Sequence, residues 1–212
     1  MFAFYYEQLM EDIDYKEILT PLLPYLPNKD KQLLDAGCGP GFILKELIEL
    51  GYDVIGIDND EEMLRLANQR LDNPNHLYYH DLNEPLTESF DGIIMLFDVI
   101  NYFYKLNPMI KNIYEGLNAH GVFIFDTYKK EYLETMRNFE EIDDEPFEYT
   151  WKTVSDKTKL NHTFIVKNKQ YQINQYVYDK KTYLKHLKKV GFKNVKIIEG
   201  NDERKDYYIC KK

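Results

Sequence analysis

Short apolar runs that end in, or run into, an acidic residue recur along the first 130 residues. They predict strands at Leu33–Ala36, Tyr52–Asp58, Leu77–Leu82, Phe90–Phe97 and Val122–Asp126. Helical patterns, with apolar residues three or four apart, separate these runs. Strands that alternate with helices predict right-handed crossovers and a mostly parallel sheet. The carboxyl ends of such strands meet at one edge, where these folds bind ligands.

The pattern changes after Glu131 from alternating strands and helices to alternating apolar and polar residues. An acidic stretch precedes three runs that predict an antiparallel β-meander at Phe147–Val154, Lys159–Val166 and Tyr171–Tyr178. A helix over Lys180–Val190 should end at Gly191. Strands at 195–198 and 207–210 should then close the chain.

These elements predict a single α/β domain over residues 1–212, organised in four parts. Residues 1–27 carry helical spacing and prolines, and form either a lid over a ligand or a helix packed on the domain edge. Residues 28–130 form the ligand-binding core, 145–178 the meander over the substrate side, and 179–212 the last helix and strands.

The segment Asp35–Gly41 is a glycine-rich turn between a strand and the helix Phe42–Leu50. Glycines allow positive φ and let a ligand approach the backbone, and the helix N-terminus faces that ligand. Asp58 follows about twenty residues later, the distance at which dinucleotide folds place a carboxylate on ribose hydroxyls. Asp58 could alternatively cap the next helix, although Asp60 could fill that role.

Composition narrows the class of protein. With 212 residues, 44% of them hydrophobic, the chain can bury one sizeable core. The formal net charge of −9 argues against a general nucleic-acid binder. Cys38 and Cys210 are too few and too far apart for a disulfide framework or a zinc site. Without a bilayer-spanning run or a signal peptide, we expect a soluble, cytoplasmic protein with no membrane partner.

The segment Leu34–Gly41, with Asp58, Asp81–Leu82 and Phe97–Tyr102, resembles the motifs of class I S-adenosylmethionine-dependent methyltransferases. The resemblance implies a doubly wound, mostly parallel seven-stranded sheet of the Rossmann-like methyltransferase type, with an inserted antiparallel β-meander. The chain also resembles a subgroup of bacterial small-molecule methyltransferases that carry this insertion. The implied cofactor is S-adenosyl-L-methionine, and the implied cofactor-binding residues are Tyr6, Tyr15, Asp35, Gly37, Cys38, Gly39, Asp58, Asn59, Met63, Asp81, Leu82, Phe97 and Asp98.

The methyl acceptor is expected to be a small molecule in a pocket lined by Asn101, Tyr102, Trp151 and His162. A sulfonium methyl is already activated, so transfer depends on aligning the acceptor rather than on acid–base groups. A base is required only if the acceptor loses a proton, and the candidate bases are His80, His162 and Asp98. The residues expected to be catalytic are Tyr102 and His162. Relatives in the subgroup often carry a basic pair where this chain has Ile173 and Tyr176.

Three alternatives remain at the level of sequence. A nicotinamide dehydrogenase would need a third glycine where this chain has Phe42. An RNA methyltransferase, acting for example on tRNA, would need a basic face, and a module that binds the cofactor without catalysis would lack a pocket beyond the methyl. No set of His, Cys and carboxylate residues has metal-ligand spacing, so no metal is expected. The oligomeric state is expected to be a monomer or a homodimer.

Overall fold

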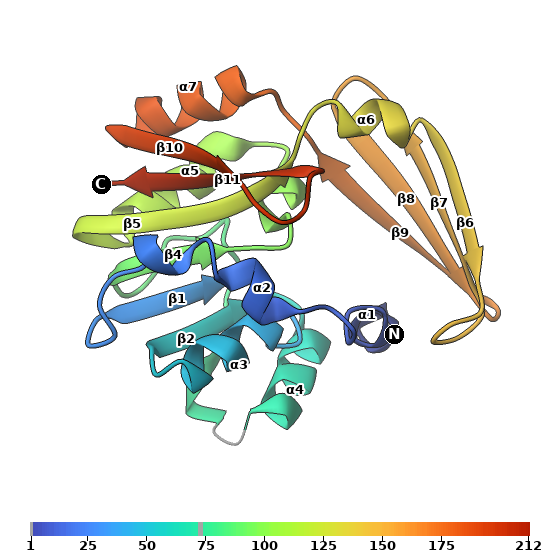
Figure 1. The fold of residues 1–212 in the computed structure, drawn as a ribbon, viewed down its shortest axis with the longest axis horizontal. Helices are drawn as coiled ribbons and strands as arrows, with labels where there is room; N and C mark the ends of the chain where they lie inside the picture. Colours follow the sequence, from blue (N-terminus) through green and yellow to red (C-terminus); the bar gives the residue numbers. More distant parts are fainter. Residues whose placement is uncertain (1, 72–73) are drawn as a thin grey trace.

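The computed structural model describes residues 2–71 and 74–212, which form a large and a small β-sheet (Figure 1). The large sheet is seven-stranded and has the order β10-β11-β5-β4-β1-β2-β3. Its strands are β1 (Gln32–Ala36), β2 (Asp53–Asp58), β3 (Leu77–Tyr79), β4 (Phe90–Met95), β5 (Leu117–Tyr128), β10 (Asn194–Glu199) and β11 (Lys205–Lys211). The pairs β10–β11 and β11–β5 are antiparallel and the other four neighbouring pairs are parallel, which confirms the predicted fold class.

Helices cover both faces of the large sheet (Figure 1). Helices α5 (Leu106–Glu115) and α7 (Lys180–Val190) bury apolar side chains against one face, and α2 (Tyr15–Leu19) and α3 (Phe42–Glu49) against the other. Helix α4 (Glu61–Arg70) lies beside β2 and β3. The short helical elements are α1 (Phe2–Leu9), α6 (Tyr132–Thr135) and the 3₁₀ turns η1 (Leu23–Tyr25), η2 (Pro74–His76) and η3 (Val99–Tyr102).

Side-chain caps fix the start of two of these helices. The Asp60 carboxylate accepts hydrogen bonds from the backbone N–H of Glu62 at 2.8 Å and Met63 at 3.4 Å. The Asp179 carboxylate accepts one from Thr182 N–H at 2.7 Å, and Gly191 ends α7 with φ 132°. Asp60 is therefore the cap of α4, which leaves the Asp58 carboxylate to another role.

The small sheet consists of four antiparallel strands, β6 (Asn138–Asp143), β7 (Tyr149–Ser155), β8 (Lys159–Val166) and β9 (Lys169–Tyr176). Three of them were predicted, whereas β6 falls in the acidic stretch before the predicted meander. Acidic residues are uncommon in strands but suit an exposed edge, where their charge discourages pairing with another chain. Most of β6 is exposed, and its acidic residues gave no alternating apolar pattern from which the strand could be predicted.

Two other elements differ in length from the prediction. Strand β3 ends at Tyr79, so His80 and Asp81 lie in the loop that follows. Strand β5 begins at Leu117 rather than Val122, and its pairing with β4 shifts register between Phe90 and Gly92. The carboxyl end of β3 therefore comes three residues before the predicted Leu82, and that of β5 two residues after the predicted Asp126.

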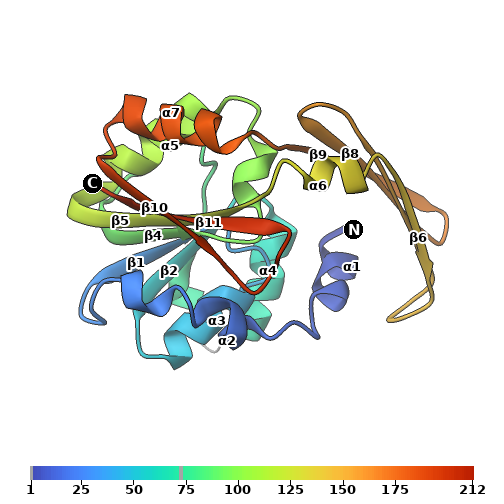
Figure 2. The same ribbon diagram turned by 45° about the horizontal axis from the view of Figure 1, so that its top comes forward.

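In both ribbon views, helix α1 lies between the small sheet and the layered part of the molecule formed by the large sheet and its helices (Figures 1 and 2). Its ring contacts reach the small sheet, where Tyr5 lies 6.1 Å and Phe2 5.7 Å from the Phe164 ring, centroid to centroid. Phe164 is fully buried. Helix α1 and the small sheet therefore share a small aromatic core beyond the carboxyl ends of β1 and β4.

Across residues 2–71 and 74–212, no helix has the length and apolar character needed to cross a bilayer.

Candidate functional site

The glycine turn after β1 is held against the end of β2 by backbone hydrogen bonds. The N–H groups of Gly37 and Cys38 both donate to the Ile57 carbonyl, at 2.8 and 2.9 Å. Gly37 and Gly39 have φ values of 78° and 52°, which L-residues with side chains seldom adopt. A Cβ at Gly37 would lie 2.7 Å from Val99 Cγ1, whereas a Cβ at Gly39 would meet no protein atom within 4 Å. Gly39 therefore faces open space.

Asp58 fixes the outer part of this turn. Its Oδ2 accepts a hydrogen bond from Gly39 N–H at 2.8 Å, and its Oδ1 accepts one from Asp60 N–H at 2.9 Å. Burial raises the Asp58 pKa above its ordinary value, although these backbone N–H groups oppose the rise. The carboxylate thus joins the glycine turn to the start of α4.

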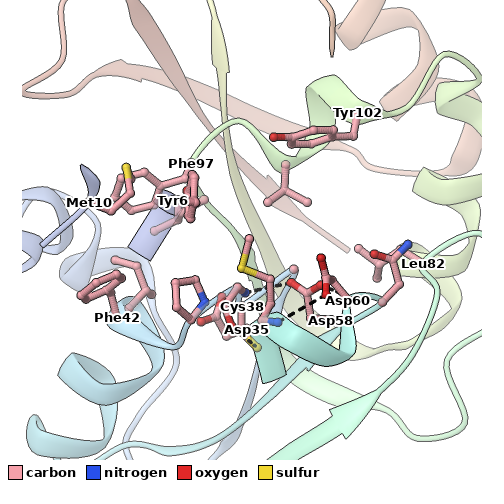
Figure 3. Close-up of a pocket in the computed structure, with 18 of the residues that line it drawn as sticks. Tyr6, Met10, Asp35, Cys38, Phe42, Asp58, Asp60, Leu82, Phe97 and Tyr102 are labelled. Atoms are coloured by element: carbon pink, nitrogen blue, oxygen red, sulfur yellow. Dashed lines mark hydrogen bonds between the residues drawn. The ribbon is translucent and has the colours of Figure 1, made fainter. Parts of the chain in front are cut away.

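A cavity of about 410 Å³ opens above the turn, within the range typical of small-ligand pockets (Figure 3). Every cofactor-binding residue expected from the sequence lines it except Asp98. Asp35, Cys38, Asp58 and Asp60 lie together on one side of the cavity, and Tyr102 lies on the opposite side (Figure 3). The structure thus brings together residues from β1, β2, α4, the loops after β3 and β4, and α1.

Asp35 is the most unusual group in this cavity. It is 3% exposed, and its Oδ2 has no hydrogen-bond partner. Burial, with a smaller contribution from the Asp58 charge, raises the pKa of Asp35 to about 8. A buried carboxyl oxygen without a partner is costly, so this site favours a ligand that brings a donor or a positive charge.

Helix α1 forms a wall of the cavity through Phe2 and Tyr6, and Met10, in the turn after the helix, extends this wall. Glu7 holds this helix to α4, because its Oε1 lies 2.6 Å from the Arg70 guanidinium. Arg70 also donates to the Pro40 carbonyl at 2.9 Å and lies over the Phe42 ring, 3.6 Å from its centroid. Tyr6 was predicted as a site residue from the sequence, whereas Phe2, Met10, Arg70 and the other residues that form or hold this wall were not.

The backbone after β4 is strained where it borders the cavity. Phe97 and Asp98 have φ values of 59° and 53°, a conformation that costs energy for residues other than glycine. Asp98 N–H donates to Asp126 Oδ1 at 2.7 Å, which helps to hold this conformation. The Asp98 side chain consequently turns toward Lys205 on β11.

Lys205 lies between two carboxyl groups in the interior. Its Nζ donates to Asp98 Oδ1 at 2.5 Å and to Asp126 Oδ2 at 3.0 Å. Burial alone would lower the Lys205 pKa, but Asp126 and Asp98 raise it well above its ordinary value. Burial raises the Asp126 pKa, and Lys205 opposes that rise. Lys205 is therefore charged at neutral pH.

A chain of hydrogen bonds connects this cluster to the small sheet. Gln175 donates from Nε2 to Asp98 Oδ2 at 2.5 Å, and its Oε1 lies 3.2 Å from His162 Nε2. Trp151 Nε1–H donates to His162 Nδ1 at 3.1 Å, with Thr153 Oγ1 2.8 Å from the same nitrogen. Because Trp151 can only donate, Nδ1 accepts and Nε2–H donates to Gln175. Burial lowers the His162 pKa, so the ring is neutral at pH 7.

A second cavity of about 600 Å³ adjoins the first and lies between the large sheet, the small sheet and α1. Asp98, Trp151, His162 and Lys205 line it. Six of the residues that the structure describes line both cavities and form the boundary between them: Phe2, Tyr6, Met10, Phe97, Tyr102 and Ile173. The Tyr102 side chain is half exposed at this boundary.

Asn101 lines neither cavity, contrary to the expectation that it belongs to the substrate pocket. Its side chain is fully buried, and its Nδ2 donates to Thr127 Oγ1 at 2.8 Å and to the Tyr176 carbonyl at 2.8 Å. Asn101 therefore joins η3 to β5 and to the end of the small sheet. Among the described residues, no group of three or more His, Cys, Asp and Glu residues could hold a metal ion.

A family model described as a methyltransferase domain matches residues 27–191. A putative methyltransferase from Bacillus subtilis (strain 168) is 29% identical over 169 residues, which cover 76% of this chain and 68% of that protein. The chain spans about two thirds of the length of the curated relatives it matches first.

Two solved structures share the fold at identities too low to show more than that. An S-adenosylmethionine-dependent methyltransferase from Clostridium acetobutylicum superposes with a TM-score of 0.78 at 22% identity, covering 99% of this chain and 97% of that one. An S-adenosylmethionine-bound amino pentose methyltransferase from Micromonospora echinaspora gives a TM-score of 0.68 at 16% identity, covering 93% and 87%.

Proposed function

Since this chain belongs to the methyltransferase-domain family, we propose that it transfers the methyl group of S-adenosyl-L-methionine to a small-molecule nucleophile. The resemblance to class I S-adenosylmethionine-dependent methyltransferases is confirmed by the family match and the shared fold. The acceptor and the individual residue roles are proposals, supported by the geometry of the two cavities.

The first cavity fits the cofactor. Gly39 presents a surface without a side chain, and Asp35 presents a buried carboxyl oxygen that lacks a partner. The cofactor carries an ammonium, a sulfonium and a carboxylate, a net charge of +1, and a cavity lined by Asp35, Asp58, Asp60 and Asp81 suits this net positive charge. The unpartnered Asp35 oxygen is the observation that carries this part of the proposal.

The cofactor would supply an activated methyl group, whose carbon a nucleophile attacks as the thioether sulfur leaves. The chain's contribution is to bind both reactants, align them and exclude water. Tyr6, Phe97 and Tyr102 lie between the two cavities, so they would border the path of the methyl group. We assign them to positioning the acceptor nucleophile.

His162 has a positioning role in this proposal rather than that of a general base. Its Nδ1 accepts from Trp151, and its Nε2–H donates to Gln175, so neither nitrogen presents a free lone pair to an acceptor.

The second cavity disfavours the two alternative functions, a module that binds the cofactor without catalysis and an RNA methyltransferase. It provides room beyond the first cavity, unlike a module without catalysis, and Asp98, Asp202 and Glu203 on its wall oppose an RNA backbone.

Titration calorimetry with S-adenosylmethionine and S-adenosylhomocysteine tests the proposal. We expect both to bind wild type, and Asp58→Ala to weaken binding by about 10-fold or more, because two backbone N–H groups lose a charged acceptor. Asp53→Ala is the matched control, since Asp53 is exposed at the other end of β2. Absence of binding to the folded wild-type protein would overturn the proposed function.

A further inference from the structure

The second cavity has an unusual balance of charge. Two basic side chains, Arg204 and Lys205, line it together with Asp98, Asp202 and Glu203. Asp14 and Glu17 of the N-terminal segment also line it. The class of acceptor that this cavity suits depends on whether either basic group is free to bind an anion.

Both basic groups are already paired with carboxylates. The single Lys205 ammonium is shared by the carboxyl groups of Asp98 and Asp126, at 2.5 and 3.0 Å. Arg204 donates from Nε and Nη2 to both oxygens of Asp202, each at 2.8 Å, a bidentate pair that occupies the guanidinium edge. No ion pair among the described residues includes Glu203. The acids on this wall therefore exceed the available cations.

Aromatic rings make up a large part of the remaining wall, together with Met10, Ile13, Ile18 and Ile173. Tyr6, Tyr102 and Trp151 line the second cavity, and a cation is attracted to the face of such rings. An anionic acceptor would meet carboxylates and ring faces, both of which repel it. A cationic acceptor would be favoured by both.

Asp98 is held where it can receive such a group. Lys205 and Gln175 each occupy one site on a different oxygen of Asp98, so two of its acceptor positions remain. Gln175 is itself fixed by His162, and His162 by Trp151, so the carboxylate has one orientation. Both Asp98 and the boundary residue Phe97 belong to the strained segment that ends β4.

We propose that the methyl acceptor is a small amine, which enters the second cavity as an ammonium ion attracted by Asp98 and the aromatic wall. This inference rests on the proposed function. The ammonium loses one proton to solvent, and the nitrogen lone pair forms the new N–C bond. The C–S bond breaks with its electron pair on sulfur, leaving a neutral thioether and an N-methylated ammonium.

The test uses wild-type protein, labelled S-adenosylmethionine and the small-molecule fraction of a bacterial cell extract. Half of the extract is first treated with an N-hydroxysuccinimide ester of acetate, which converts amines to uncharged amides. We expect label to enter the untreated extract and at least a 10-fold loss of incorporation after treatment. Undiminished incorporation after treatment overturns the amine proposal while leaving the proposed function standing. Cofactor binding without incorporation into either half overturns both.

Variants then locate the site, using an amine identified from the labelled products. Asp98→Asn should lower kcat/KM by about 30-fold or more, as expected when one partner of a buried charge contact is removed, while cofactor affinity stays within threefold. Glu203→Gln avoids the buried cluster, and should raise KM about two- to fivefold with kcat unchanged. Asp144→Asn, exposed on the loop after β6, is the matched control. Wild-type kcat/KM in both Asp98→Asn and Glu203→Gln would overturn the placement of the ammonium.

Discussion

The pKa of Asp35 predicts that cofactor binding releases a proton. With a pKa of about 8 in the free protein, about one molecule in eleven carries an ionised Asp35 at pH 7. A cationic ligand favours the ionised form, so binding at pH 7 includes the cost of removing that proton. This cost is about 1.4 kcal/mol, or about tenfold in affinity, and it disappears as the pH passes 8.

Calorimetry in two buffers of different ionisation enthalpy, such as phosphate and Tris, counts the protons released. At pH 7 we expect wild type to release about 0.9 proton more per bound S-adenosylmethionine than Asp35→Asn does. The ratio of wild-type to Asp35→Asn affinity should rise about tenfold from pH 6 to pH 7 and level off near pH 8. The variant is necessary because the ligand's own amino group also titrates near pH 8.

Equal proton release by wild type and Asp35→Asn, with an affinity ratio constant from pH 6 to 8.5, would refute this reasoning. It would show that Asp35 keeps one protonation state throughout. Preserved thermal unfolding of the variant is the control, since an asparagine could still occupy this buried position near the end of β1.

Two further perturbations test the glycine turn and the buried histidine. Gly39→Ala should cost about 1–2 kcal/mol of stability because of its positive φ, and its Cβ should project into the cavity and weaken cofactor binding about 10-fold or more. Gly51→Ala is the control: its φ is 84° and its Cβ would make only an ordinary contact with Lys29 Cδ at 3.9 Å, so it should cost similar stability without loss of binding. Burial lowers the pKa of His162 in the folded protein below its ordinary value of 6.5, so the unfolded chain binds a proton at a higher pH than the folded protein does. The free energy of unfolding should therefore fall by up to about 1.4 kcal/mol per pH unit as the pH drops below about 6.5. Urea unfolding of His162→Gln should lack this pH dependence, and the same pH dependence in both proteins would contradict the reasoning.

The sequence could predict the large sheet because its signals are local. Each strand is a short apolar run, and the helices between them carry their own spacing and caps, as with Asp60 at the start of α4. The glycine turn can also be recognised from the sequence, because the positive φ angles at Gly37 and Gly39 require glycine. These features depend on residues close together in the chain, so no knowledge of the tertiary fold was required.

The walls of the cavities depend instead on contacts between distant segments. Met10 and Phe42 border the first cavity because Glu7 and Arg70, far apart in the sequence, form an ion pair. Asn101 shows the opposite error. It follows β4 at the position expected for a substrate contact, yet its amide points inward to Thr127 and to the end of the small sheet. Sequence spacing placed the residue near the site but could not give its direction.

Lys205 is the clearest case of a group that the sequence conceals. It lies among charged residues in the segment Asp202–Asp206, which by composition resembles an exposed turn. Its burial follows from the antiparallel pairing of β11 with β5, which sets Lys205 opposite Tyr128 and brings its ammonium to Asp126 and Asp98. An ammonium so placed is stable only with its carboxylates. Of the two, Asp98 lines the second cavity, and it is held there by Gln175, which in turn contacts His162 of the small sheet. The acceptor side of this protein is therefore a joint product of the terminal strands and the inserted sheet, so substitutions in either should change acceptor choice before they change cofactor binding.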